Sequence, residues 1–510
     1  MQWRRVEAAR ELLAGERGAI VRDWGGQLPI VLAYPHSYAV GMSSLAMHAL
    51  YGWLNARPGI VCERAFASLD GRPSPGEPVF TLESQRPMGD AAVIAFSVSF
   101  EMDYFHVLDM LRRSGVPVAA AERGPGDPLV LMGGPAVSAN PLPLALVADA
   151  IVLGEVEPIL DDLLRRLEGV WDAEREATLS SLAQVPGVYV PTLHQGQAVE
   201  RQWLSDLDAY PVGSTIVAPR SAFGDMQLIE ISRGCVWGCK FCLAGCWYRP
   251  WRERSVEVIL RQAREGMVYW NKVGLVASAV SDYTRIDELT AALRALGLKV
   301  SVSSLRVRPL SEKLVQALAE SGARTFTLAP EAGSDRLRQK IQKGVRHEDV
   351  IRAVALAGRY RFESLKLYFM WGLPGERDED IEAIADLVNA VLELFPRQVV
   401  VNLTPFVPKA HTPFQREAMA STEVLEDRLD RLRRRLRRTR TQLRAEAVEE
   451  ARIQALLARG DHHVSQALLT LQKPSPRLLE PALRRMGIDP AVYRGARGAD
   501  ERLPWEFIRL

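Results

Sequence analysis

The chain has 510 residues, of which 47% are hydrophobic, and it carries a formal net charge of +2. A chain of this length exceeds what one hydrophobic core usually serves, so we expect two or three domains. The small net charge indicates no particular partner, and no stretch approaches the roughly 18 apolar residues of a membrane span.

The cysteine pattern favours a reducing compartment. Three of the five cysteines stand within eight positions, which is not the pattern of a disulfide framework. Residues 1–27 predict a charged, amphipathic helical segment without the apolar core of a signal peptide. We therefore expect a cytoplasmic protein.

Residues 28–165 predict a Rossmann-like domain. Short runs rich in Val and Ile alternate with helix-like stretches, and this alternation is typical of a doubly wound parallel sheet. Ligands of such sheets bind at the carboxyl ends of the strands. Small residues at two of these ends, Ser97, Ser99, Gly133 and Gly134, leave room for a large ligand. The strand candidates are 28–35, 91–99, 128–135 and 149–155.

A connecting segment, 166–225, leads to a strand-like run at 228–232 and then to Cys235, Cys239 and Cys242 at C-x3-C-x2-C spacing. A structural zinc site closes its tetrahedron with four protein ligands. Three thiolates on one loop hold three irons of a [4Fe-4S] cube and leave the fourth iron open for chemistry. We therefore expect an iron–sulfur cluster after this strand.

Strand-like and helix-like stretches alternate again from 226 to 420. Counting the run at 228–232, six strands predict a partial (β/α)6 barrel, open on one side, with the active site at the carboxyl ends of the strands. The further strand candidates are 274–281, 298–305, 325–331, 364–372 and 399–406.

Residues 421–510 predict a mostly helical, arginine-rich extension. No Gly or Pro occurs from Thr422 to Ala458, which predicts one long helix or a helical hairpin. Nine arginines lie between Arg428 and Arg444. Such a stripe is typical of a surface for RNA or an acidic partner, and equally of a solvated face. We expect His462 and His463 to begin a helix rather than to bind a metal.

The run ISRGCVWGCKFC, which contains the three cysteines, resembles the cluster loop of the radical S-adenosylmethionine (SAM) enzymes. Phe241, before the last cysteine, also matches that family. The resemblance implies a [4Fe-4S] cluster on Cys235, Cys239 and Cys242 whose open iron chelates SAM. It further implies reductive cleavage to a 5′-deoxyadenosyl radical, with a donor such as flavodoxin or ferredoxin supplying the electron.

A doubly wound domain followed by this loop resembles the cobalamin-binding branch of the same superfamily, in a bacterial subgroup without an established substrate. In many members the first loop reads D-x-H-x-x-G, with the His ligating cobalt. Here Tyr38 stands at the histidine position and Gly41 at the glycine, so any cobalamin would lack a protein imidazole below the metal. Ser97, Ser99, Gly133 and Gly134 match the loops that line the corrin tail. The alternative is a domain that has lost cobalamin and roofs the barrel.

Four barrel positions resemble the family's SAM contacts, namely Asp282, Ser303, Glu331 and Gly372, the last within MWGLPG beside the adenine. For the first three, the alternative is a solvated residue at a strand end. Cys246, four residues past the cluster motif, departs from the subgroup. Its interpretations are a spare ligand, a radical or methyl relay, or a packed thiol, and we favour the packed thiol. The arginines that follow, Arg249, Arg252 and Arg254, are expected at the seam between the domains.

The sequence thus predicts a radical SAM enzyme of the α/β class. Its expected parts are a Rossmann-like cobalamin-type domain, a partial barrel and a helical extension, and its expected reaction is cobalamin-dependent C-methylation. One alternative is a cobalamin-free radical SAM enzyme that rearranges its substrate or forms a ring. The other is a non-catalytic RNA-associated protein that binds through the arginine stripe.

Overall fold

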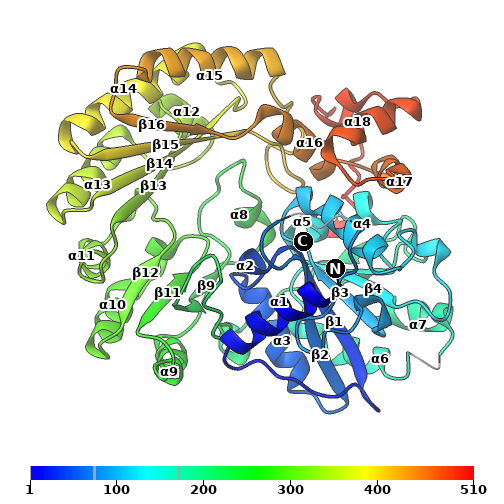
Figure 1. Ribbon diagram of the computed structural model, residues 1–510. Helices are drawn as coiled ribbons and strands as arrows, with labels where there is room; N and C mark the ends of the chain where they lie inside the picture. Colours follow the sequence, from blue (N-terminus) through cyan, green and yellow to red (C-terminus); the bar gives the residue numbers. More distant parts are fainter. Residues whose placement is uncertain (1, 73–75, 171–172) are drawn as a thin grey trace.

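The computed structural model describes residues 2–72, 76–170 and 173–510. Its first part is a six-stranded sheet in the order β2-β1-β3-β4-β5-β6, parallel except for β6 (Figure 1). The strands are β1 Leu28–Ser37, β2 Ile60–Ser68, β3 Val93–Ser97, β4 Leu129–Gly133, β5 Ala150–Val152 and β6 Val188–Tyr189.

Two hydrophobic layers cover this sheet, as a doubly wound fold requires. Side chains alternate along each strand, so Ile30 and Leu32 of β1 face one layer while Val31 and Ala33 face the other. The first layer holds α1 Gln2–Gly15, α3 Leu45–Asn55, α6 Leu160–Leu167 and α7 Arg175–Leu182. The second holds α4 Tyr104–Arg113 and α5 Pro135–Ala139. The Rossmann-like prediction is confirmed.

Strand β2 was not among the strands predicted from the sequence. Its run IVCERAFAS contains Glu63 and Arg64, and charged residues are rarely buried unless they are paired. Here Arg64 is buried between Glu16 and Glu83, at 2.6 Å from each carboxylate. The partners lie far away in the sequence, so the local pattern did not indicate a buried strand.

The second part is an open barrel built from two sheets. One has the order β12-β11-β8 and the other β13-β14-β15-β16, and a parallel bridge between Leu305 and Leu328 connects them. The strands are β8 Gln227–Glu230, β11 Lys272–Val276, β12 Lys299–Val302, β13 Thr325–Glu331, β14 Ser364–Trp371, β15 Gln398–Pro405 and β16 Thr441–Ala445. The outer helices are α9 Val256–Gly266, α10 Ile286–Ala295, α11 Glu312–Glu320, α12 Asp335–Lys340, α13 His347–Arg359, α14 Asp378–Leu394 and α15 Thr422–Leu436.

The described residues place seven strands in the barrel region rather than six, because β16 lies within the segment expected to be helical. The expectation of one long helix or a helical hairpin over 422–458 is wrong. The segment forms α15, then β16, then α16 Val448–Ala458. Residues 441–445 alternate, with Thr441, Leu443 and Ala445 less exposed than Gln442 and Arg444. The free edge of β15 supplies the hydrogen-bonding partner that this short strand needs.

The chain end returns to the first domain. Helices α16, α17 His462–Thr470 and α18 Pro476–Arg485 share the hydrophobic layer of α4, and Figure 1 shows α17 and α18 beside α4 and α5. Strand β17 Ile508–Arg509 pairs with β7 Val199–Glu200. Helix α17 begins at His462, as expected. None of the helices in the described residues is both long and apolar enough to cross a membrane.

Candidate functional site

The three cysteines lie on a loop, residues 234–242, between β9 Ser232–Arg233 and α8 Leu243–Trp247. This cluster loop follows the carboxyl end of β8 and is held at both sides. The amide of Lys240 donates to the Ile341 carbonyl at 3.0 Å, and the amide of Phe414 donates to the Lys240 carbonyl at 3.1 Å. Gly234 has a φ of +86°, and a Cβ there would collide with the Tyr248 carbonyl. The turn before Cys235 therefore requires glycine.

Two of the three cysteines, Cys235 and Cys242, lie beside the start of α8. A Cβ added to Gly245 would lie 3.9 Å from the Cβ atoms of both Cys235 and Cys242. Burial, together with the neighbouring Cys239 and Cys235, raises the pKa of Cys242 to about 11. Within the described ranges, no three His, Cys, Asp or Glu side chains are grouped to hold one metal ion. A cubane instead takes each thiolate at a different iron, so this donor set fits a [4Fe-4S] cluster.

Asp282 lies beside the cluster loop. Its carboxylate accepts a hydrogen bond from the Trp237 indole at 2.9 Å, and the Arg306 guanidinium stacks 4.2 Å from the Trp237 ring centroid. Burial raises the pKa of Asp282. This carboxylate therefore orients a residue of the loop itself, a role that the sequence reading did not include.

Glu331 ends β13 in a left-handed conformation, with a φ of +69°. The register between β13 and β14 shifts at this point, and the carboxylate pairs with Lys343 at 2.9 Å. A non-glycine residue held at positive φ stores strain, and such residues cluster at functional sites. Ser303 is exposed just past the end of β12.

Gly372 follows β14, and packing accounts for the glycine at this position. Its φ is +76°, and a Cβ would lie 2.5 Å from Cδ2 of Leu425 on α15. Its amide donates to the buried Glu376 carboxylate at 2.6 Å. These contacts explain the residue without a nucleoside.

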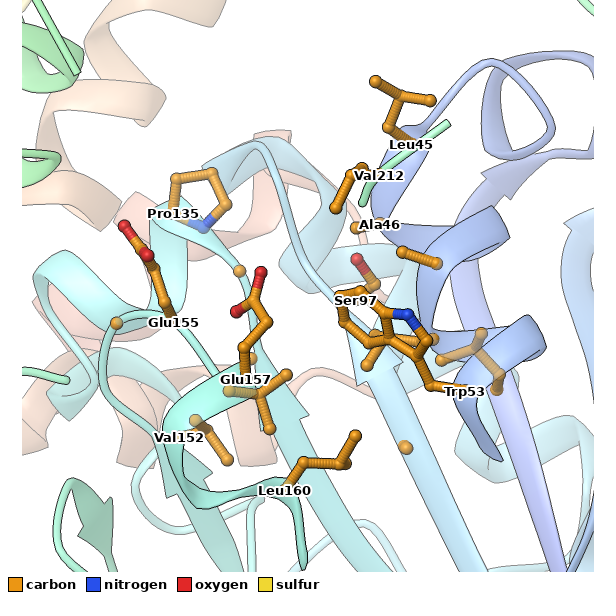
Figure 2. Close-up of a pocket in the computed structure, with 18 of the residues that line it drawn as sticks. Leu45, Ala46, Trp53, Ser97, Pro135, Val152, Glu155, Glu157, Leu160 and Val212 are labelled. Carbon is orange, nitrogen blue, oxygen red and sulfur yellow. The ribbon is translucent and has the colours of Figure 1, made fainter. Parts of the chain in front are cut away.

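A cavity of about 390 Å³ lies where the first domain meets the barrel. Its volume is in the range of pockets that hold small ligands and cofactors. Apolar side chains of α3, α6 and the sheet form most of its wall, and Figure 2 shows Trp53 and Glu157 entering from opposite sides. Ser97, Ser99, Gly133 and Gly134, all selected from the sequence, line it together.

The glycines and serines mark the polar end of this cavity. Gly134 has a φ of +105°, and a Cβ there would lie 2.5 Å from the Val98 carbonyl. The loops after β3 and β4 therefore touch through backbone, which keeps side chains out of the space above them. This geometry fits the polar tail of a large cofactor.

The structure places Tyr38 and Gly41 elsewhere. Both belong to α2 Tyr38–Gly41 and neither lines the cavity. The Tyr38 hydroxyl is buried and donates to Glu16 at 2.6 Å, beside Arg64. A Cβ on Gly41 would meet the Phe66 ring. Both residues therefore have packing contacts in this structure, and a cofactor contact at these two positions stays a prediction.

A buried ion network, absent from the sequence reading, joins the cavity to the cluster loop. Arg233, two residues before Cys235, contacts Glu155 at 2.8 Å, Glu157 at 2.9 Å and Glu230 at 2.9 Å. Arg252 also pairs with Glu155, at 2.8 Å. Burial would raise the pKa of Glu155, but Arg252 and Arg233 outweigh it and the pKa is lowered. These buried, hydrogen-bonded ion pairs join the two domains at the seam between them.

Of the arginines that follow the loop, Arg252 reaches Glu155 of the first domain, whereas Arg254 pairs with Glu230 of β8 at 3.0 Å, within the barrel. Cys62, on β2 of the first domain, is fully buried. The sequence analysis did not predict the roles of Glu155 and Glu157. Only their position just after a strand, within 153–157, could have indicated them.

Two family models match the chain. The model of radical SAM proteins, N-terminal, matches residues 46–191, and the radical SAM superfamily model matches residues 229–388. An uncharacterized protein of Methanocaldococcus jannaschii is 31% identical over 452 residues, which is 88% of this chain and 92% of that protein. The chain belongs to the radical SAM superfamily, whose members are enzymes that use a [4Fe-4S] cluster and SAM.

Other relatives and structures are more distant. An uncharacterized methyltransferase of Pyrococcus horikoshii is 26% identical over 50% of this chain and 56% of its own. The fold is similar to that of TsrM from Kitasatospora setae, a radical SAM methyltransferase solved with cobalamin and a [4Fe-4S] cluster. That match has a TM-score of 0.52 and 15% identity, covering 76% of this chain and 77% of that one. OxsB, a cobalamin-dependent radical enzyme, matches with a TM-score of 0.50 and 17% identity over 71% of this chain and 52% of its own.

Proposed function

We propose that this enzyme cleaves SAM reductively to a 5′-deoxyadenosyl radical and uses cobalamin to methylate carbon in its substrate. The observation that carries the proposal is the cavity at the carboxyl ends of β3 and β4, which extends to Ser232 and Arg233 before the cluster loop. A cofactor held there lies between the two domains. The [4Fe-4S] cluster, when bound, supplies the electron for SAM cleavage, and cobalamin, when bound, supplies the methyl group.

Individual residues have defined tasks in this proposal. Cys235, Cys239 and Cys242 hold the cluster, and Glu331, with Lys343 as its partner, faces the methionyl or ribosyl part of SAM. Asp282 orients the loop through Trp237 rather than touching SAM. Trp53 offers an aromatic face within the cavity for a nucleotide base, while Ser97 and Ser99 offer hydroxyl groups.

Two further settings belong to the proposal. A reducing, cytoplasmic environment suits an oxygen-sensitive cluster, and flavodoxin or ferredoxin is the kind of donor that supplies its electron. The RNA-binding alternative loses support in part of the arginine stripe. Arg428, Arg431, Arg433 and Arg435 each pair with a carboxylate, which is the pattern of a solvated, ion-paired helix. The other five arginines of the stripe have no ion pair among the described residues.

The decisive test of the radical chemistry is Cys239→Ala. We expect the wild-type protein, reconstituted anaerobically with iron and sulfide, to release 5′-deoxyadenosine from SAM and a reductant. Cys239→Ala should lose cluster absorption and this product. Cys246→Ala is the matched control and should keep both, because Cys246 is expected to pack rather than bind iron. Product from Cys239→Ala at the wild-type level would refute the assignment.

The cobalamin proposal is tested separately with Ala46→Phe, which fills the cavity beside Trp53. Protein purified from cobalamin-fed cells should yield cobalamin on extraction from wild type and from the exposed control Ala496→Phe. Ala46→Phe should lose most of the bound cobalamin while it still cleaves SAM. Wild-type protein without cobalamin would favour the cobalamin-free rearrangement or ring-forming enzyme.

A further inference from the structure

The barrel sheet β13-β14-β15-β16 has an inner face, opposite the face on which the outer helices pack. Leu365 and Leu367 of β14, like Val399 and Val401 of β15, pack into the core with the outer helices. Because side chains alternate along a strand, the residues between them point to the opposite, inner face. We call this face the inner wall, and its members are Lys366, Tyr368, Met370, Val400, Asn402, Thr404, Gln442 and Arg444.

The inner wall is polar and partly open around Tyr368, whereas Val400 is buried and Met370 packs against a hydrophobic cluster. Tyr368 is 40% exposed although β14 has a strand on each side, so nothing in the described chain covers this position fully. The side-chain nitrogen of Asn402 is buried and has no hydrogen-bond partner among the described residues. A buried amide without a partner costs free energy, which a ligand that supplies an acceptor recovers.

Arg444 differs from the four arginines of α15 that pair with carboxylates. Within residues 2–72, 76–170 and 173–510, its guanidinium has a single hydrogen bond, to Gln442 at 2.9 Å, and no carboxylate partner. Glu446, two residues further on, instead accepts from the Thr404 hydroxyl at 3.0 Å. Lys366 lies on the same face, one row away beside Val400 and Gln442. The wall therefore carries the positive charges of Lys366 and Arg444 and the negative charge of Glu446, and among the described residues Arg444 has no ion pair.

Three of these groups form a row. The parallel register places Tyr368 opposite Asn402 and Asn402 opposite Arg444. Neighbouring strands lie about 4.8 Å apart, so a phenol, an amide and a guanidinium stand side by side across three strands. All three can donate hydrogen bonds, and the guanidinium fork matches the oxygens of a carboxylate or phosphate.

The row lies next to the expected SAM contacts. Glu331 pairs in register with Phe369, the residue between Tyr368 and Met370. We propose that Tyr368, Asn402 and Arg444 bind an anionic group, a carboxylate or a phosphate, on the enzyme's substrate. This inference rests on the proposed function, because it takes the inner wall to face the reacting centre.

The test measures anion binding by isothermal titration calorimetry of the reconstituted protein, with succinate and inorganic phosphate as separate probes at constant ionic strength. We expect saturable binding of at least one probe to wild type. Arg444→Gln should weaken it roughly ten- to a hundredfold, and Arg444→Lys by less. The probe that binds more tightly identifies the anionic group as carboxylate or phosphate.

Arg434→Gln is the matched control, because it removes the same charge from an exposed position on α15 and should leave binding unchanged. Tyr368→Phe should weaken binding by a few-fold while preserving the ring. The proposal fails if neither probe saturates, or if the Arg434 and Arg444 variants lose binding equally. Its failure is separate from that of the proposed function, since SAM cleavage by the same wild-type sample reports on the radical chemistry alone.

Discussion

At the scale of single residues, His48 shows how a buried polar group sets the pH range over which the first domain is stable. Its Nε2 lies 3.1 Å from the Met42 carbonyl, and its Nδ1 accepts from the amides of Thr215 and Ile216 at 3.3 and 3.4 Å. This arrangement requires the neutral ring, because only a neutral imidazole both donates and accepts. Burial lowers the pKa of His48 from 6.5 to about 4.

We expect His48→Gln to reduce the acid sensitivity of folding. The unfolded chain takes up a proton near pH 6.5 while the folded protein resists it down to about pH 4, so stability falls as the pH falls through this window. Between pH 7 and pH 5 the wild type should lose about 2 kcal/mol through this residue. Urea unfolding followed by tryptophan fluorescence at both pH values measures the difference. An equal acid loss in the variant would assign the effect to other groups.

At the scale of elements, the loops after β3 and β4 depend on one backbone contact. Gly134 begins α5 from a left-handed conformation that brings it against the Val98 carbonyl. The same contact keeps the polar end of the cavity free of side chains. Gly134 therefore serves both the packing of these loops and the proposed binding of the cofactor.

Gly134→Ala should destabilise the protein by about 1–3 kcal/mol, because alanine adds a methyl group at an unfavourable φ and in contact with backbone. It should also reduce cobalamin retention. Gly126→Ala is the control, since a Cβ there meets nothing within 4 Å. Thermal unfolding of both variants checks the prediction, and equal midpoints would contradict it.

The strands also show which elements a local sequence pattern predicts and which it does not. Strand β13 spans the predicted residues 325–331, and β14 ends one residue before the predicted end at 372. Their apolar alternation is local and was therefore readable. Strand β2 was missed because the carboxylates that pair with Arg64 lie elsewhere in the fold, and β16 because its one arginine, Arg444, continues the arginine-rich pattern of the preceding helix.

At the scale of the whole molecule, the seam between the domains depends on buried charge. Glu155 accepts from both Arg233 and Arg252, and its side chain is 3% exposed. Removing one member of such a network leaves the opposite charges buried without a partner, which costs far more than the loss of a surface pair. The network also lies between the cavity and Cys235, so we expect its loss to destabilise both domains.

Glu155→Gln should lower the unfolding free energy by about 3–5 kcal/mol, measured by urea unfolding at neutral pH. Glu257→Gln, which breaks a pair with Arg285 whose side chains are 69% and 44% exposed, should change it by about 0–1 kcal/mol. Equal effects of the two substitutions would show that the seam does not depend on this carboxylate.

The sequence by itself determined the features that lie within one short stretch, namely the three thiols on their loop, the apolar strands and the small residues at strand ends. These signals are readable because spacing and periodicity act over a few residues. Only the tertiary structure decided which distant groups meet. The burial of Tyr38 against Glu16, the charged seam around Arg233, and the row of Tyr368, Asn402 and Arg444 each bring together residues far apart along the chain, through packing that no local pattern encodes.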